Sequence, residues 1–426
     1  MGLQQITGNE IAAGSIAATD LASASITGDK LGLTAINANN IVNATITTTQ
    51  IASNTISNTN IQTGAIEVYS SSRSTGLFDG MRNRIINGAM VIDQRNAGAS
   101  VTPTDLQYIV DRWQGVMSQN SKFSAQQNAG SVTPPTGFKN YLGATSLSSY
   151  SVVAADYFLL RQPIEGFNIA DLGFGTANAK TITLSFQVYS SLTGTFGGAV
   201  QNSGFTRSYP FSYTVSSANT WTTVSVTIVG DTSGTWLSTN GVGLYLSFSL
   251  GAGSTFSGTA GAWAGTNYIS VTGATSVVGT NGATFYITGV QLEVGSTATS
   301  FDNLDCGRSL IQCQRYYYKK STQITNSDMR YGMGFSASGS STTAYIDVTL
   351  PVNMRIGPTS VDWNNTIALW SGGTNFQVTA ISIYTSGAGT TSCLLQCTSS
   401  GLTGEKPYQL VAYASGGASL ALSAEL

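Results

Sequence analysis

The stretch KTITLSFQVY, residues 180–189, decides the fold more than any other part of the chain. Its apolar residues Ile182, Leu184, Phe186 and Val188 alternate with polar ones, which is typical of an antiparallel strand buried on one face. Similar runs recur nearby between turns rich in Gly, Ser, Thr and Asn: WTTVSVTIVG at 221–230, VGLYLSFSL at 242–250 and TFYITGVQLEV at 284–294. Short strands at this spacing predict an all-β sandwich, and a jelly roll in particular.

Two tryptophans of this region are predicted to lie in the core. Trp221 aligns with the later apolar residues of 221–230 if one β-bulge absorbs the odd spacing that follows it. Trp113 ends a short apolar run, and large aromatic side chains commonly anchor cores. We expect its neighbours Asp111 and Arg112 to form a local ion pair at the strand end.

The composition excludes several classes of function. Charged residues make up 9% of the 426 residues, against about 25% in an ordinary soluble domain, and there is no histidine. Ser-His-Asp catalysis, Cys-His catalysis and imidazole metal sites are therefore excluded. A formal net charge of −2 offers no electrostatic basis for binding nucleic acid, and no apolar run reaches the ~18 residues of a membrane span. We expect a protein that is not an enzyme and has no cofactor, nucleic-acid partner or membrane insertion.

The cysteines suggest neither a disulfide framework nor a metal site. They are few and lie late in the chain, at Cys306, Cys313, Cys393 and Cys397. The spacings C-x6-C and C-x3-C fit a zinc ribbon poorly. We expect reduced, partly buried thiols and no bound metal.

A five-residue period runs through the N-terminal segment. Five residues advance roughly 500° on a helix and reverse the face of a straight strand, so the chain must turn every five residues. We interpret residues 1–67 as a repeat shaft and the polar, Gly-bearing residues 68–80 as a linker. The shaft core is predicted to consist of Ile6, Ile11, Ile16, Leu21, Ile26, Leu31, Ile36, Ile41, Ile46, Ile51, Ile56, Ile61 and Ile66.

Two architectures are compatible with this period. One is a single-chain pentapeptide-repeat β-helix, but the Ala that this family usually carries two residues before the apolar centre is found only at Ala24 and Ala44. The other is a shaft in which three identical chains wind together. One Ile per five residues is a thin core for a single chain, and thin cores favour oligomers. We therefore favour the homotrimer and keep the single-chain solenoid as the alternative.

Several segments resemble those of bacteriophage tail fibre proteins. Units such as ITGDKLGLTAI and TITTTQIASNTI resemble the repeats of phage fibre shafts. Two other segments resemble the two ends of a domain that is common in these proteins and similar to carbohydrate-binding-module jelly rolls. Its opening is resembled by the segment NRIINGAMVIDQRNAGAS (83–100), followed by DLQYIVDRWQG (105–115). Its closing strand is resembled by TGVQLEVGSTATSF (288–301). Later segments resemble parts of the same fibre proteins: CGRSLIQC (306–313), QRYYYKK (314–320), LPVNMRIGPTSVDW (350–363) and ALSAEL (421–426).

The chain after the linker divides into three predicted parts. Residues 81–301 form the jelly-roll, carbohydrate-binding-like domain. Residues 302–320 interrupt the β pattern, and Asp305 is placed to cap a short helical connector. Residues 321–426 contain further strand-like runs, such as 343–354, and are predicted to form a second small β-sandwich, the C-terminal tip domain.

Five aromatic residues are candidates for binding glycan: Trp236, Trp263, Trp363, Trp370 and Tyr331. Trp236 and Trp263 each stand alone in a Gly- and Ser-rich loop with no obvious core partner. The other three border loops of the predicted tip. Exposed aromatic rings beside amides match the C–H faces and hydroxyls of sugars. The alternative for each residue is a role in filling a loop, the tip or a contact between copies.

The acidic residues offer little for catalysis. Polysaccharide-cleaving tail spikes use paired carboxylates. Asp156, Glu165 and Asp171 cluster in sequence, as do Asp302 and Asp305, but sequence does not show whether any two face each other. The chain also lacks the long parallel β-helix that such spikes usually resemble.

A structural calcium, which some jelly rolls of the resembled family hold between their first and last strands, is not expected here. The first strand offers Asp93 and the last offers only Glu293. The acidic pair often found in that last strand is missing.

The resemblance implies a phage tail fibre protein that mediates host recognition and adsorption. The N-terminus would attach to the phage tail or another virion protein, and loops of trimeric β-sandwiches would bind host cell-surface polysaccharide with avidity. The protein would then lie in the virion, as a tail appendage. The alternatives are a head or capsid fibre and, at lower weight, a polysaccharide-cleaving tail spike.

Overall fold

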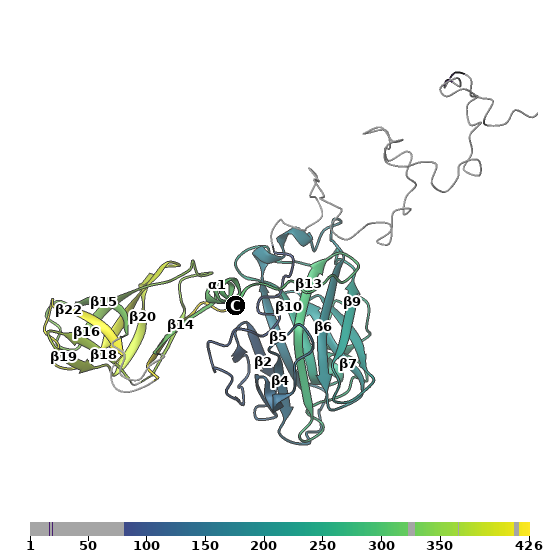
Figure 1. The fold of residues 1–426 in the computed structure, drawn as a ribbon, viewed down its shortest axis with the longest axis horizontal. Coiled ribbons are helices and arrows are strands. Elements are labelled where there is room, and N and C mark those ends of the chain that lie inside the picture. Colours follow the sequence, from purple (N-terminus) through teal and green to yellow (C-terminus); the bar gives the residue numbers. More distant parts are fainter. Residues whose placement is uncertain (1–16, 18, 20–80, 323–328, 365, 413–416) are drawn as a thin grey trace, which may run out of the picture. The chain divides into compact units, whose positions relative to one another are not determined.

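The computed structural model describes residues 17, 19, 81–322, 329–364, 366–412 and 417–426. Apart from residues 17 and 19, the predicted shaft with its Ile and Leu core residues, and the predicted linker, lie outside the described residues. The described residues from 81 onward belong to one compact unit, which contains two β-sandwiches (Figure 1). Within the described part, no helix is long and apolar enough to cross a membrane.

The first sandwich has two main sheets, and every strand pair within them is antiparallel. The six-stranded sheet has the order β1 (Tyr108–Val110), β2 (Trp113–Met117), β5 (Tyr157–Glu165), β10 (Val242–Ala252), β7 (Gly194–Gln201) and β8 (Ser208–Val215). The five-stranded sheet has the order β3 (Phe123–Gln127), β4 (Leu142–Ser146), β13 (Thr284–Val294), β6 (Ile182–Ser190) and β9 (Thr222–Ile228). Two short strands, β11 (Ser257–Gly258) and β12 (Ser270–Val271), pair in parallel outside these sheets. The predicted all-β, jelly-roll class is confirmed.

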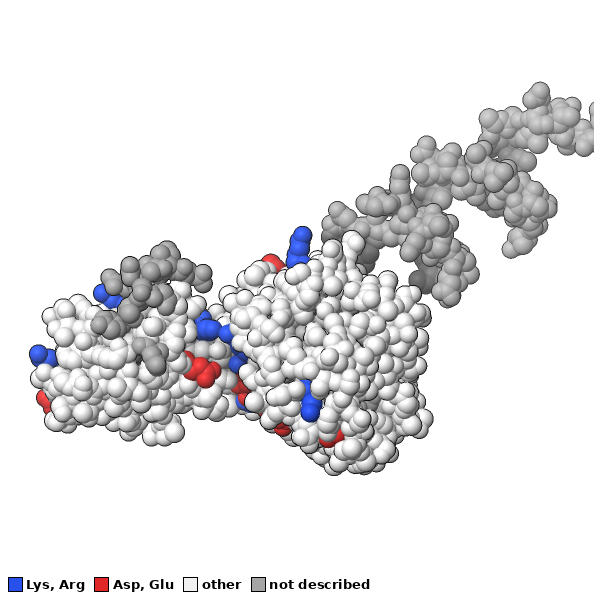
Figure 2. Space-filling view, turned by 90° about the horizontal axis from the view of Figure 1, so that it is seen from below, with Lys and Arg blue, Asp and Glu red and all other residues white. Residues whose placement is uncertain are grey.

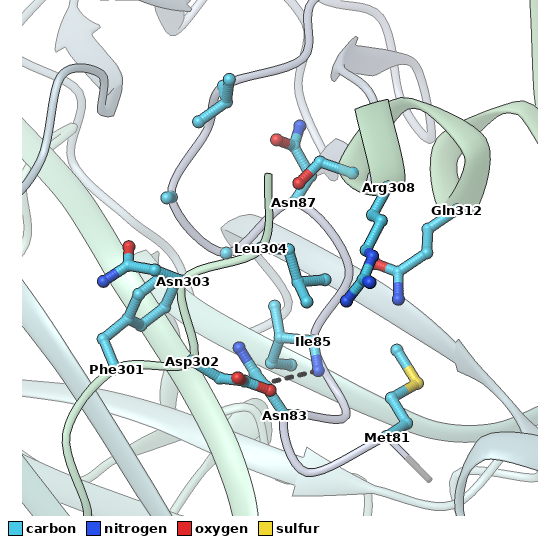
Figure 3. Close-up of a pocket in the computed structure, with 14 residues that line it drawn as sticks. Met81, Asn83, Ile85, Asn87, Phe301, Asp302, Asn303, Leu304, Arg308 and Gln312 are labelled. Atoms are coloured by element: carbon cyan, nitrogen blue, oxygen red, sulfur yellow. Dashed lines mark hydrogen bonds between the residues drawn. The ribbon is translucent and has the colours of Figure 1, made fainter. Parts of the chain in front are cut away.

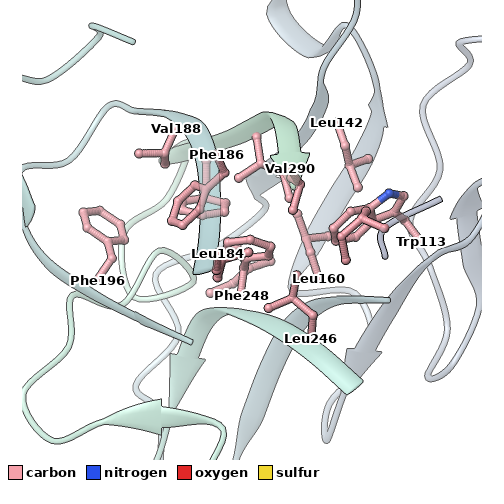
Figure 4. Packing of buried hydrophobic residues seen from close by; sticks show 14 of the residues in the cluster. Trp113, Leu142, Leu160, Leu184, Phe186, Val188, Phe196, Leu246, Phe248 and Val290 are labelled. Carbon is pink, nitrogen blue, oxygen red and sulfur yellow. The ribbon is translucent and has the colours of Figure 1, made fainter. Parts of the chain in front are cut away.

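The core of this sandwich lies between the two sheets. In β6, Ile182, Leu184, Phe186 and Val188 are all buried, as their alternation predicts. Figure 4 shows side chains from both sheets meeting there, and the rings of Phe186 and Phe248 lie 4.9 Å apart, edge to face. Trp113 has no exposed surface, so its predicted core position is confirmed.

The predicted position of Trp221 in this core is wrong. The pairing of β9 with β6 runs without a bulge, so the apolar residues from Val224 onward share the inner face and Trp221, one residue before the strand, lies on the opposite side. There Trp221 packs 5.5 Å from the ring of Tyr141 and 5.4 Å from that of Tyr189, beside Tyr286. The period of two in a strand decides the outcome, because an odd offset changes the face.

A short helix, α1 (Cys306–Gln314), follows the first sandwich. The Asp305 side chain accepts a hydrogen bond from the backbone N–H of Arg308, which satisfies one of the helix's free N-terminal donors. The predicted Asp305 cap of a short helix is therefore confirmed. Short 3-10 turns lie at η6 (Ala129–Ser131), η7 (Gly166–Asn168), η8 (Ala170–Leu172) and η9 (Ser254–Phe256).

The second sandwich contains a three-stranded and a seven-stranded antiparallel sheet around a separate apolar core. The smaller sheet has the order β14 (Tyr317–Ser321), β23 (Ser419–Ser423) and β17 (Ser360–Trp363). The larger has the order β19 (Thr374–Gln377), β18 (Ile367–Ser371), β22 (Pro407–Ala412), β15 (Arg330–Ser336), β16 (Thr343–Thr349), β21 (Ser392–Thr398) and β20 (Ala380–Ala388).

Ion pairs join the first sandwich to the α1 segment and to the second sandwich. Figure 2 shows a mostly uncharged surface with blue and red side chains gathered in the region between them. Arg112 of the first sandwich pairs with Glu425, next to the last residue of the second, and its guanidinium lies 3.7 Å from the ring centroid of Tyr316. Arg315 pairs with Glu165 at 2.6 Å. The predicted local pair of Arg112 with Asp111 is therefore wrong, because the partner of Arg112 comes from the far end of the sequence.

Candidate functional site

A groove of about 430 Å³ lies on the outer face of the six-stranded sheet. The outward-facing side chains of β2, β5, β10 and β7 form its floor, and loop residues from 105–106, 205 and 256–269 form its sides. The lining residues are Asp105, Leu106, Gln114, Val116, Tyr157, Leu159, Arg161, Gln201, Phe205, Tyr245, Phe256, Asn267, Ile269 and Leu426.

Aromatic rings form two sides of this groove. The rings of Phe205 and Tyr245 stack with centroids 5.1 Å apart and planes 9° apart. Tyr157 and Phe256 meet edge to face at 5.2 Å. Phe205 has a φ of +52°, in the left-handed region that a bulky residue rarely adopts, and this turn between β7 and β8 directs its ring over the sheet.

Amides and one cation provide the polar groups. Gln114 and Arg161 lie opposite each other on paired strands, and the Gln114 Oε1 atom accepts hydrogen bonds from Arg161 Nε at 3.3 Å and Nη2 at 3.2 Å. Gln201 Nε2 donates to Asn267 Oδ1 at 2.6 Å. The Gln201 Oε1 atom is buried and has no hydrogen-bond partner in the described part of the chain. The groove therefore combines flat apolar surfaces with a few polar side chains, as a pocket that orients a polar ligand requires.

Trp236 and Trp263 do not lie alone, which corrects the expectation that they lack a core partner. Their rings meet edge to face at 5.5 Å, and both pack on the buried ring of Phe174. Their indole N–H groups donate to the backbone carbonyls of Ser233 and Val229. They close one part of the jelly-roll core, and their partners were not evident because Phe174 lies about 60 to 90 residues earlier in the chain.

The other three candidates are dispersed over the second sandwich. Trp363, in β17, is half-buried and lines a cavity of about 420 Å³ with Arg95, Tyr108 and Tyr317 among others. Trp370, in β18, is half-buried and lies 5.9 Å from the guanidinium of Arg330. Tyr331 lies within strand β15, where only 5% of its surface is exposed. None of the five candidates lines the groove on the six-stranded sheet.

The acidic residues singled out in the sequence are engaged in structural contacts. Asp156 accepts hydrogen bonds from Ser118, Tyr150 and the backbone of Val153; burial acts to raise its pKa, but these bonds hold the pKa below its ordinary value. Glu165 pairs with Arg315. Three others have partners of their own: Asp171 binds Arg84, Asp302 binds Arg82, and Asp305 caps α1.

The carboxylates considered for calcium are likewise bonded within the chain. Asp93 accepts from the backbone N–H groups of Asn96 and Gly98. Glu293 accepts from Thr299 and from the Gln291 side chain. Across the described ranges, no group of three potential metal-ligating side chains lies together.

The four cysteines are free thiols. Cys306 is exposed, and the other three are buried. Burial raises the pKa of Cys393 to about 11 and that of Cys397 to about 12, so these thiols are protonated and unreactive at neutral pH.

Another cavity, of about 340 Å³, lies where the start of the first sandwich meets the segment before α1 (Figure 3). Asn83 Oδ1 accepts hydrogen bonds from the backbone N–H groups of Ile85 and Leu292, which ties the opening segment to β13. Phe301 and Leu304 add apolar walls. The buried amide of Asn83 serves the fold, and this cavity lacks the stacked rings of the groove.

No family model matches the chain. No curated protein matches it either. Among solved structures, the enzymatically active domain of tailspike protein 4 from bacteriophage CBA120 is similar with a TM-score of 0.28 and 9% identity, over 50% of this chain and 22% of that one. A putative sugar-binding protein from Bacteroides thetaiotaomicron gives a TM-score of 0.30 and 11% identity, over 50% of this chain and all of that one. A family 11 carbohydrate-binding module from Clostridium thermocellum gives 0.24 and 11%, over 47% and 98%. TM-scores this low do not establish a relationship.

Proposed function

We propose that this protein is a phage tail fibre protein that binds carbohydrate on the host surface through the groove of its jelly roll. The observation that carries the proposal is the pairing of aromatic rings with amide side chains in a groove on the outer face of the sheet. Aromatic rings cover the apolar faces of a sugar, and amides bind its hydroxyls. The paucity of charge, 9% of residues, suits recognition by hydrogen bonds and stacking.

The sequence resemblance to phage fibre proteins supports the biological context. The N-terminal attachment to the tail or another virion protein, the virion location and the homotrimeric shaft are parts of the same proposal. Three copies of a weak saccharide site on one particle would together bind with useful avidity. A trimer is tested by mass measurement in solution: a particle of one 44.3 kDa chain would restore the single-chain solenoid. A head or capsid fibre remains the alternative, and it predicts no adsorption to host cells.

We also propose that the protein is not a polysaccharide-cleaving enzyme. The acids that cluster in sequence are bonded to arginines, tyrosine, hydroxyls or backbone amides in the described structure. A catalytic pair needs two carboxyls that face the substrate across a short gap. Release of oligosaccharides from host polysaccharide by the purified protein would contradict this proposal.

Adsorption of the full-length protein to host cells, and binding to the polysaccharide purified from them, tests the main proposal. Tyr245→Ala removes one ring of the stacked pair, and loss of one such contact is expected to weaken binding about tenfold. Tyr384→Ala serves as the matched control, because Tyr384 is an exposed tyrosine on the second sandwich, outside the groove. Equal binding by wild type and Tyr245→Ala would place the saccharide elsewhere, and no adsorption to any permissive host would favour the structural fibre.

A further inference from the structure

Arg161 is a buried cation at the floor of the groove. It lies in the middle of β5, in the apolar run FLLRQPI, and only 7% of the residue is exposed. Its guanidinium carbon lies 4.4 Å from the ring centroid of Tyr245, and two of its nitrogens donate to the neutral Gln114 side chain. Its third nitrogen, Nη1, donates to no residue in the described part of the chain.

Arg161 also lacks the carboxylate partner that Arg112, Arg207 and Arg315 possess. Among the described residues, Arg112 pairs with Glu425, Arg207 with Asp231 and Arg315 with Glu165, whereas no ion pair involves Arg161. The one acidic side chain in the groove lining is that of Asp105, an exposed residue whose carboxylate accepts a hydrogen bond from the backbone N–H of Met117.

A buried charge without an oppositely charged partner costs free energy. Because Arg161 faces an open groove, a bound ligand can supply the missing negative charge. Burial lowers the pKa of Arg161 below its ordinary value, yet a guanidinium remains protonated in any protein. Its planar fork matches a carboxylate with two parallel N–H···O bonds. A ligand that brings such a group would satisfy the charge inside a largely desolvated site.

We infer that the groove binds an acidic saccharide of the uronic-acid class, with its carboxylate on Arg161. This inference rests on the proposed function and specifies its ligand. The sugar ring lies against Tyr245 and Phe205, and the half-buried amide of Asn267, which lines the groove, binds a hydroxyl. The pairing of rings with amides favours a sugar over a free inorganic anion, which would use Arg161 alone.

Calorimetric titration of the full-length protein tests the inference. The probes are oligosaccharides of polygalacturonate and hyaluronan, each compared with its carboxyl-reduced, neutral counterpart. We expect at least one acidic probe to bind at least tenfold more tightly than its reduced form. Arg161→Gln should abolish this difference between the acidic probe and its reduced form. Arg308→Gln, at an exposed arginine in α1, is the matched control and should bind like the wild type.

The outcomes separate the two proposals. If acidic and reduced probes bind equally and Tyr245→Ala weakens both, the groove binds saccharide and the acidic assignment is wrong. If dextran sulfate binds as tightly as the carboxylated probes, the site recognises negative charge without preferring a carboxylate. That result also overturns the acidic assignment. If no saccharide binds, both proposals fail. Arg161→Gln removes an unpaired charge, so its thermal unfolding should match or exceed that of the wild type, and binding can be compared in folded protein.

Discussion

Glu425, near the end of the second sandwich, pairs with two arginines of the first sandwich. Removing its carboxylate should destabilise the protein strongly. Its carboxylate pairs with Arg95 at 2.8 Å and more closely with Arg112. The side chains of Glu425 and Arg112 are 7% and 1% exposed, so solvent screens the pair little. Glu425→Ala would leave the Arg112 charge buried without an acid, beside Tyr108, Tyr316 and the Pro163 carbonyl. Removing one partner of a buried pair costs about 3–5 kcal/mol.

The assay is urea unfolding of the full-length protein followed by tryptophan fluorescence, since Trp113 is adjacent to Arg112 in the chain. The control is Arg308→Ala, which breaks the exposed pair with Asp305, whose side chains are 76% and 64% exposed. Such a pair contributes about 0.5 kcal/mol or less. If Glu425→Ala and Arg308→Ala shift the unfolding free energy equally, the Arg112–Glu425 pair stabilises the protein no more than the exposed pair does. The reasoning from burial is then refuted.

Three further outcomes follow from buried groups. Burial raises the pKa of Asp111 to about 6 from 3.8. Its contribution to stability should therefore be full below about pH 4 and fall by about 3 kcal/mol as the pH rises from about 4 to 6. Unfolding measured from about pH 3.5 to 7 should show this slope in the wild type and lose it in Asp111→Asn, and an unchanged slope would assign it elsewhere. Iodoacetamide at pH 8 should label Cys306 alone in the native protein and all four thiols in urea, as counted by mass spectrometry; native labelling of Cys393 or Cys397 would show that they are accessible. Trp113→Ala should cost about 3–5 kcal/mol in urea unfolding, and a cost near zero would contradict its core role.

Much of the fold was predictable because strand alternation is local. The alternation in 180–189 identified the inner face of β6, and the Ser/Thr-rich turns marked the strand ends. Asp305 was identified as a helix cap from its position alone. Trp221 was misplaced because one residue of offset reverses the face, and a bulge was assumed where the ladder is continuous.

The groove was missed because its aromatic residues lie in or beside ordinary strands and turns. Tyr157 and Tyr245 are each one residue in an alternating run, and nothing local distinguishes a ring that faces a groove from one that faces solvent. One signal was present: Arg161 interrupts the apolar run FLLRQPI. A charge inside a buried strand marks either an ion pair or a ligand site, and only the cross-strand neighbours decide between them.

The sequence alone therefore determined the all-β class, the faces of the regular strands and the scarcity of groups for acid–base catalysis, because each depends on composition or on neighbours within a few residues. The tertiary structure decided which distant residues meet. It placed Glu425 on Arg112, packed Trp236 and Trp263 on Phe174, and left Arg161 beside aromatic rings and amides without a carboxylate. The physical reason is that pairing between strands far apart in the chain is set by topology and burial, which local periodicity does not encode.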